Sequence, residues 1–204
     1  MKISLDIDDP SLLNFGWDWW LRLKEHYPEL KLSVFYIPFD PHAETSQLRL
    51  ERDSAVKKLK ENLDWIRLYP HGLTHMPREL ANCDYYTMRD LVLPAIDEAF
   101  KKDDLPYVKG FKAPYWLWSN GVIRALNEAG WWGAIDRNQP EMLTTAKFYS
   151  YSHSIDEPFW EAEGDLRLHG HLDGQSSNDI EKCFINLLKM PQDAEFVFID
   201  EFVI

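Results

Sequence analysis

Short runs of apolar, β-branched and aromatic residues alternate along this chain with segments of helical periodicity. Two parallel strands need a crossover between them, and a helix is its usual form. The alternation therefore predicts an α/β fold, a single-domain distorted (β/α) barrel of about seven parallel strands spanning residues 1–204. The expected strands are 2–7, 31–38, 65–69, 108–112, 132–135, 148–153, 166–169 and 195–199.

Charge and hydropathy narrow the class of partner. Asp and Glu number 34 against 22 Lys and Arg, which gives a net charge of −12. This balance argues against nucleic acid and against an anionic membrane surface as partners, because both are bound through clustered basic residues. No apolar run approaches the length of a membrane span. The opening residues, 1–6, contain an acid where a secretory signal needs an apolar run, so we expect a cytoplasmic protein.

Side chains that can bind a metal or transfer a proton follow five of the expected strands. In parallel α/β folds the functional residues lie at the carboxyl ends of the strands. If the chain closes into a barrel, all five groups meet at one mouth. The groups are Asp8 with Asp9, His71 with His75, Lys112 with Tyr115, Asp136, and His169 with His171.

His71 and His75 are four residues apart, a spacing that places both imidazoles on one face of a helical turn. Such a pair suits one divalent cation, with the ring nitrogens about 2.0–2.1 Å from a zinc ion. Coincidental surface histidines are the alternative. Asp9 is an acid next to Asp8, and two adjacent carboxylates favour a nearby cation. Asp9 before Pro10 also fits a helix N-cap.

Lys112 has two interpretations, a cation beside the carboxylates of Asp8 and Asp9 or a solvated lysine at the end of a strand. We expect only one of His169 and His171 to face the barrel interior. His169 is the preferred candidate because Gly170 can begin the following loop, and His171 is the substitute.

These residues, in this order, resemble the metal-dependent polysaccharide deacetylases of carbohydrate esterase family 4. The resemblance covers nearly the whole chain, and it departs from the family pattern at Lys112, where arginine is usual, and at Pro10, where glycine is usual. The matching segments are Leu5-Asp6-Ile7-Asp8-Asp9, His71-Gly72-Leu73-Thr74-His75, Phe111-Lys112-Ala113-Pro114-Tyr115, Asp136, and Leu166-Arg167-Leu168-His169.

The resemblance implies removal of an N-acetyl group from an amino sugar or glycoconjugate. It also implies a divalent cation, Zn²⁺ first and Co²⁺, Ni²⁺ or Mn²⁺ as alternatives, held by Asp9, His71 and His75. The remaining matched residues then have catalytic roles. Asp8 is the base, His169 the acid, Lys112 orients Asp8, the Tyr115 N–H faces the oxyanion, Asp136 supports His169, and Tyr115 and Trp116 contact the sugar.

Two other functions remain open. The same metal site would also suit a hydrolase of another amide or of an O-acetyl ester, because a metal-activated water does not recognise the acyl acceptor. A carbohydrate-binding barrel with weak or no catalysis is the alternative outside enzymes. Nine tryptophans suit either a sugar-stacking cleft or the core.

Overall fold

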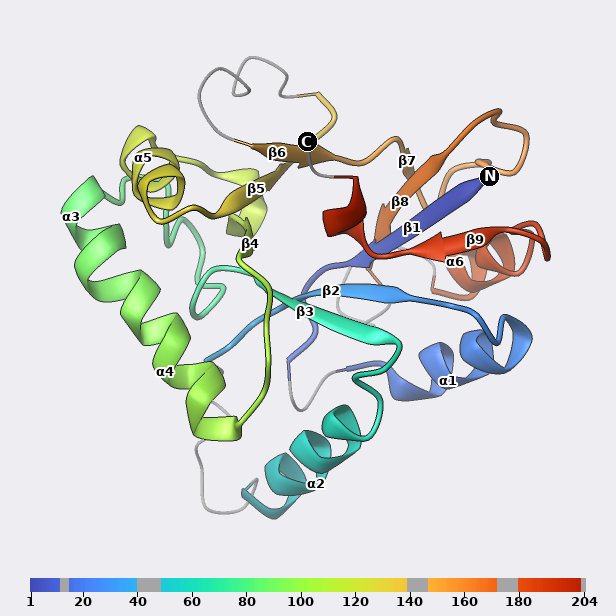
Figure 1. Ribbon diagram of the computed structural model, residues 1–204, viewed down its shortest axis with the longest axis horizontal. Helices are drawn as coiled ribbons and strands as arrows, with labels where there is room; N and C mark the ends of the chain where they lie inside the picture. The colour runs from blue at the N-terminus through green and yellow to red at the C-terminus, as the bar shows by residue number, and fades with distance from the viewer. Residues whose placement is uncertain (12–14, 40–48, 139–146, 172–179, 203–204) are drawn as a thin grey trace.

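A computed structural model describes residues 1–11, 15–39, 49–138, 147–171 and 180–202 and shows two arcs of parallel strands (Figure 1). The larger arc has the order β3-β2-β1-β8-β7, and β9 pairs with the first half of β1. The smaller arc has the order β4-β5-β6. The strands are β1 (Lys2–Ile7), β2 (Leu32–Tyr36), β3 (Ile66–Pro70), β4 (Gly110–Lys112), β5 (Trp132–Ile135), β6 (Phe148–Ser150), β7 (His153–Ser154), β8 (Leu166–Gly170) and β9 (Glu195–Val197).

The two arcs are joined on both sides. A parallel bridge between His71 and Lys112 connects the end of β3 to the end of β4. On the other side, the chain from Phe148 to Ser154 contributes β6 to the smaller arc and β7 to the larger one. The expected parallel α/β barrel architecture is therefore confirmed, and the single strand expected at 148–153 is divided between the arcs.

Helices surround the strands, as Figure 1 shows for α1, α2, α4 and α5. α5 begins where the Ser119 hydroxyl accepts a hydrogen bond from the Val122 N–H at 3.2 Å, which satisfies one of the free N–H groups at a helix start. The helices are α1 (Trp17–His26), α2 (Arg49–Lys60), α3 (Tyr85–Thr87), α4 (Leu93–Asp103), α5 (Asn120–Glu128) and α6 (Ile180–Leu187). None of the described helices is long and apolar enough to cross a lipid bilayer.

Side chains of β1 alternate between two environments. Ile3, Leu5 and Ile7 are fully buried in the main apolar core, which also includes Trp20 of α1. Asp6 lies on the opposite face, in the barrel interior, because successive residues of a strand point to opposite faces. Aromatic side chains make up most of the apolar interior, including Phe35, Tyr69, Trp132 and Tyr149.

The amino-terminal end of the barrel interior is closed by the short 3₁₀ segment η4 (Ile199–Glu201). Asp200 accepts hydrogen bonds from Arg67 at 2.8 Å and from the Tyr69 hydroxyl at 2.5 Å. The Ile199 N–H donates to the Ser33 hydroxyl at 3.1 Å. These contacts cover the starts of β2 and β3, so the polar groups at the strand ends lie at the opposite mouth.

Candidate active site

Strand register brings the expected residues together at the carboxyl ends of the strands. Asp6 of β1 lies opposite His169 of β8 in the parallel ladder. The bridge between His71 and Lys112 places the end of β3 beside the end of β4. Asp8 follows β1 directly, and its N–H donates to the Gly170 carbonyl at 3.1 Å. Residues more than 160 positions apart in the sequence thus share one mouth.

The three residues proposed as metal ligands converge on one point. Oδ1 of Asp9 lies 3.1 Å from Nε2 of His71 and 2.9 Å from Nε2 of His75. Ligand atoms of the three residues lie within 4.8 Å of one another. Oδ1 of Asp9 is buried and makes no well-directed hydrogen bond with the described residues, which suits an oxygen whose lone pair faces a cation. Two imidazoles and one carboxylate are a donor set found in catalytic zinc sites, so the residues fit a divalent cation.

Charge at this point favours a cation as well. Burial would raise the pKa of Asp9, but the two histidines hold that pKa well below its usual value. Burial would lower the pKa of His71, but the nearby carboxylates of Asp8 and Asp9 raise it. The ring of His71 also turns its Nδ1 to the Lys112 carbonyl at 3.1 Å. Because Nδ1–H donates there, the lone pair of Nε2 faces Asp9, as expected for a metal ligand with a supporting hydrogen bond.

The segment from His71 to His75 is a loop rather than the helical turn expected from its spacing. Gly72 has a φ of +66° directly after β3, in the left-handed region, so the chain cannot begin a helix there. The carboxylate of Glu79 then holds the loop, because it accepts hydrogen bonds from the Leu73 N–H at 2.7 Å and from the Thr74 N–H at 3.1 Å. The two imidazoles converge because the loop reverses direction.

Several site residues have unusual backbone conformations. Asp9 has a φ of +69°, His75 of +56°, Tyr115 of +56° and Trp116 of +58°, and the described chain has only two other non-glycine residues with positive φ. Such conformations cost of order 1–3 kcal/mol each and persist where the surrounding structure enforces them. The barrel therefore holds the loops of Asp9 and His75 and the Tyr115 turn in strained geometry at this mouth.

Lys112 lies between two buried carboxylates. Its Nζ donates to Oδ1 of Asp8 and to Oδ1 of Asp6, each at 2.7 Å, and its side chain is 1% exposed. The sequence predicts Asp8 and Asp9 as the partners of Lys112. In the structure its partners are Asp8 and Asp6. The three aspartates bring one negative charge each against the single ammonium, so two negative charges remain for one divalent cation to balance.

His169 and His171 both face the site, which corrects the expectation that only one would. Residues two apart on a strand share a face, so an inward His169 predicts an inward His171. His169 is buried, with Nδ1 at 2.8 Å from Oδ1 of Asp6 and Nε2 at 3.8 Å from Oδ2 of Asp8. His171 is more exposed and lies 3.5 Å from Oδ2 of Asp9. Asp8, His169 and His171 form a second group of possible ligands, but the Lys112 ammonium beside Asp8 disfavours a second cation there.

Asp136 lies further from the chemistry than the sequence analysis expected. Its carboxylate accepts hydrogen bonds from the Tyr151 hydroxyl at 3.0 Å and from the Asn138 N–H at 2.7 Å. The ring of Tyr151 in turn packs on His169 with a centroid distance of 4.7 Å. Asp6, rather than Asp136, is the carboxylate that accepts a hydrogen bond from Nδ1 of His169.

Tyr115 and Trp116, the expected sugar contacts, lie in the 3₁₀ segment η2 (Pro114–Trp116). Tyr115 is 54% exposed, and its ring lies 5.0 Å from that of His75. Trp116 packs its ring at 5.3 Å from His169 and at 4.7 Å from the Lys112 ammonium. One ring is thus exposed beside His75, and the other covers His169 and Lys112.

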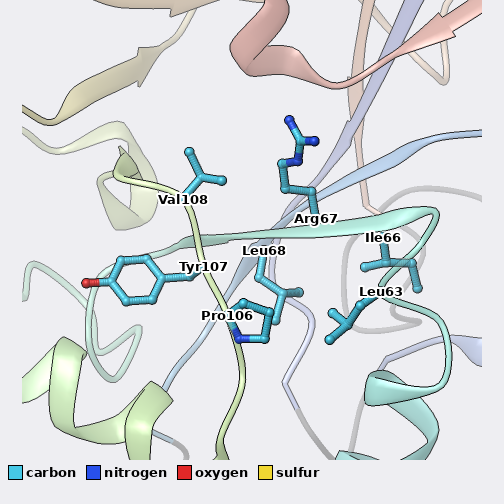
Figure 2. Close-up of a pocket in the computed structure, with 7 residues that line it drawn as sticks. All are labelled: Leu63, Ile66, Arg67, Leu68, Pro106, Tyr107 and Val108. Carbon is cyan, nitrogen blue, oxygen red and sulfur yellow. The ribbon is translucent and has the colours of Figure 1, made fainter.

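A separate cavity of about 160 Å³ lies between β3 and residues 106–108, away from this mouth (Figure 2). Its lining is mostly apolar, from Leu63, Leu68 and Tyr107 among others. The Arg67 guanidinium points away from it and is bonded to Asp200. The two polar side chains of this cavity are already paired, Arg67 with Asp200 and Tyr107 with Asp97.

No protein-family model matches the chain, and no curated protein is similar to it at a significant level. Solved structures of family 4 carbohydrate esterases do share its fold. The Xyl-CE4 domain of a multidomain xylanase from the hindgut metagenome of Trinervitermes trinervoides is 18% identical, with a TM-score of 0.62 over 98% of this chain and 87% of that one. The Bc1960 peptidoglycan N-acetylglucosamine deacetylase is 16% identical, with a TM-score of 0.63 over 98% and 86%.

A third similar structure is BA3943, described as a family 4 pseudoenzyme from Bacillus anthracis. It is 15% identical, with a TM-score of 0.61 over 98% of this chain and 64% of that one. The resemblance seen in the sequence is thus confirmed at the level of the fold, and the fold occurs in both active and inactive proteins.

Proposed function

We propose that residues 1–204 form a metal-dependent deacetylase that removes an N-acetyl group from an amino sugar or glycoconjugate. The observation that carries this proposal is the convergence of His71 and His75 on Oδ1 of Asp9, with Asp8 and His169 beside them. The fold is shared with structures described as a family 4 esterase domain and as an N-acetylglucosamine deacetylase, which agrees with this chemistry.

Asp9, His71 and His75 would hold the cation, with Zn²⁺ as the first expectation and Co²⁺, Ni²⁺ or Mn²⁺ as alternatives. A bound divalent cation supplies Lewis acidity, which polarises the acetyl carbonyl and lowers the pKa of water. The Lys112 carbonyl keeps the His71 tautomer that ligation requires.

The remaining residues have roles in moving protons and placing the substrate. Asp8 accepts the proton of the attacking water, and Lys112 keeps that carboxylate oriented. His169, in its imidazolium form with Nδ1–H on Asp6, donates its Nε2 proton to the departing sugar amine, so the products are acetate and a free amino sugar. The Tyr115 N–H stabilises the oxyanion. The exposed Tyr115 ring and the neighbouring Trp116 offer faces for a sugar ring.

Acetate release from N-acetylated amino sugars tests the proposal, and O-acetylated sugars serve as the competing substrates. We expect turnover of the N-acetyl substrates, a loss of at least 100-fold in kcat for Asp8→Asn, and no bound metal in Asp9→Asn by elemental analysis of untagged protein. Asp200→Asn, at the opposite end of the barrel, is the matched control. Activity unchanged by Asp8→Asn would contradict the assigned base, and activity confined to O-acetyl sugars would assign the site to ester hydrolysis.

The second candidate is a carbohydrate-binding barrel with weak or no catalysis, favoured by the likeness to BA3943 and by lysine at position 112. Lys112→Arg separates the two. If lysine is a defect, restoring the family residue should raise acetate release. In our proposal Lys112 fits between Asp6 and Asp8. Because the guanidinium is larger, Lys112→Arg should then lower acetate release or leave it unchanged. Sugar binding without any acetate release would favour the binding barrel.

A further inference from the structure

Asp6 is a buried carboxylate to which the proposed function gives no role. Its side chain has no exposed area, and it lies on β1 two residues before Asp8, on the same inward face. Burying a charged group is costly unless it is paired, so a carboxylate in this place needs strong partners. Lys112 and His169 are those partners.

A single oxygen of Asp6 accepts from two sides of the site. Oδ1 lies 2.7 Å from Nζ of Lys112 and 2.8 Å from Nδ1 of His169. Burial would raise the pKa of Asp6, but Lys112 and His169 lower it well below its usual value. The carboxylate is therefore ionised and can only accept hydrogen bonds, which means that Nδ1 of His169 carries a proton.

This hydrogen bond decides which ring nitrogen of His169 faces the chemistry. With Nδ1–H donated to Asp6, Nε2 lies on the side of Asp8, 3.8 Å from its Oδ2. Two aromatic rings hold the plane of the imidazole, Tyr151 at 4.7 Å and Trp116 at 5.3 Å with an interplanar angle of 79°. The acid is thus fixed in both tautomer and orientation.

Asp6 is also connected to Asp8 through Lys112, because the same ammonium donates to both carboxylates. The chain therefore has a continuous buried series of contacts from Asp8 through Lys112 and Asp6 to His169. Asp136, the acid expected to support His169, touches Tyr151 instead. Asp6 of β1 thus takes the place beside His169 that the sequence predicted for Asp136 at the end of β5.

We propose that Asp6 is a positioning residue of the deacetylase site, which fixes His169 with Nε2 toward the substrate and shares Lys112 with Asp8. The expected effect on catalysis rests on the proposed function. The expected orientation and protonation of the His169 ring do not. Outer partners of this kind typically change activity by about 10–100-fold when removed.

The test compares Asp6→Asn with the matched control Asp200→Asn, which also removes one paired carboxylate, but at the far end of the barrel. ¹⁵N NMR of histidine-labelled protein, with the His169 signal assigned by its loss in His169→Gln, reports the tautomer without turnover. At alkaline pH, where the imidazole is neutral, we expect Nδ1–H in the wild type and in Asp200→Asn, and a mixed or Nε2–H population in Asp6→Asn.

A neutral wild-type His169 protonated on Nε2 and not on Nδ1 would overturn the inference, and this measurement stands even if Asp6→Asn fails to fold. An unchanged tautomer in Asp6→Asn would overturn it too. So would a tautomer change in Asp136→Asn without one in Asp6→Asn, because the orienting role would then belong to Asp136.

Steady-state kinetics of the same variants are the second test. In Asp6→Asn we expect kcat to fall about 10–100-fold with KM within about twofold, and the alkaline limb of the pH–rate profile to move to lower pH. An equal loss in Asp200→Asn, or an unmoved alkaline limb, would show a general structural effect and contradict the positioning role. Absence of all acetate release in the wild type would refute the proposed function, while the NMR arm would still decide the role of Asp6.

Discussion

Replacing Lys112 by methionine keeps most of the side-chain length and removes the one ammonium among the described residues that contacts both Asp6 and Asp8. Each N–O distance is 2.7 Å, at which two unit charges attract by about 6 kcal/mol with an effective dielectric constant of about 20. Desolvation offsets most of that gain, and breaking a buried pair typically costs about 3–5 kcal/mol. Because two carboxylates lose the same partner, we expect a loss of about 5 kcal/mol in unfolding free energy at pH 7.

The loss should depend on pH. In the wild type, the pKa of Asp6 is lowered in the folded state, so the ionised carboxylate stabilises the fold above its unfolded pKa of about 3.9. That contribution disappears as pH falls through the folded pKa. Without Lys112, burial dominates and raises the folded pKa, so the variant loses stability as pH rises above about 3.9. The difference in unfolding free energy between the variant and the wild type should therefore become smaller from pH 7 to pH 4.5.

Urea unfolding of metal-free protein at both pH values measures these differences. The double variant Asp6→Asn with Lys112→Met should recover part of the loss, because one uncompensated carboxylate is gone. Lys57→Met is the control, since this lysine is largely exposed and should cost no more than about 0.5 kcal/mol. A loss below about 1 kcal/mol at pH 7, or a difference that does not become smaller on acidification, would refute the reasoning.

Two further predictions concern the metal ligands. Gly72→Ala places a Cβ 2.6 Å from Cγ of Pro114 at a φ of +66°, so unfolding free energy should fall by about 1–3 kcal/mol and zinc affinity by tenfold or more in calorimetric titration. Gly164→Ala has φ +85° but open space, so it should keep wild-type zinc affinity. The apparent Kd for zinc should rise about tenfold per pH unit below the raised pKa of His71, because its proton must leave. A Kd that stays constant between pH 5 and 8 would exclude His71 as a ligand.

The barrel itself was predictable because strand and helix patterns alternate along the whole chain. The strand expected at 132–135 has those bounds in the structure. Positions at strand ends are also predictable in parallel folds, which explains why the sequence alone indicates Asp9, His71 and His169. These features depend on local pattern and on a general rule of topology.

Other features depended on backbone conformation that spacing does not reveal. The histidine loop is not helical because Gly72 adopts positive φ, and its shape depends on Glu79, an acid indistinguishable in sequence from a surface glutamate. Asp6 was missed for a different reason. Strand alternation alone places Asp6 on the inward face with Asp8, and the same rule pairs His169 with His171. Both facts were available in the sequence once the period of two was applied.

Lysine at position 112 does not by itself indicate a lost activity. Arginine holds one carboxylate with a planar fork, whereas a lysine ammonium has three separate donors. Two of those donors go to Asp6 and Asp8 at equal distances. Asp6 therefore shares the Lys112 ammonium with Asp8 and gives His169 an acceptor in place of Asp136. This use of both donors favours a rearranged site over a degraded one.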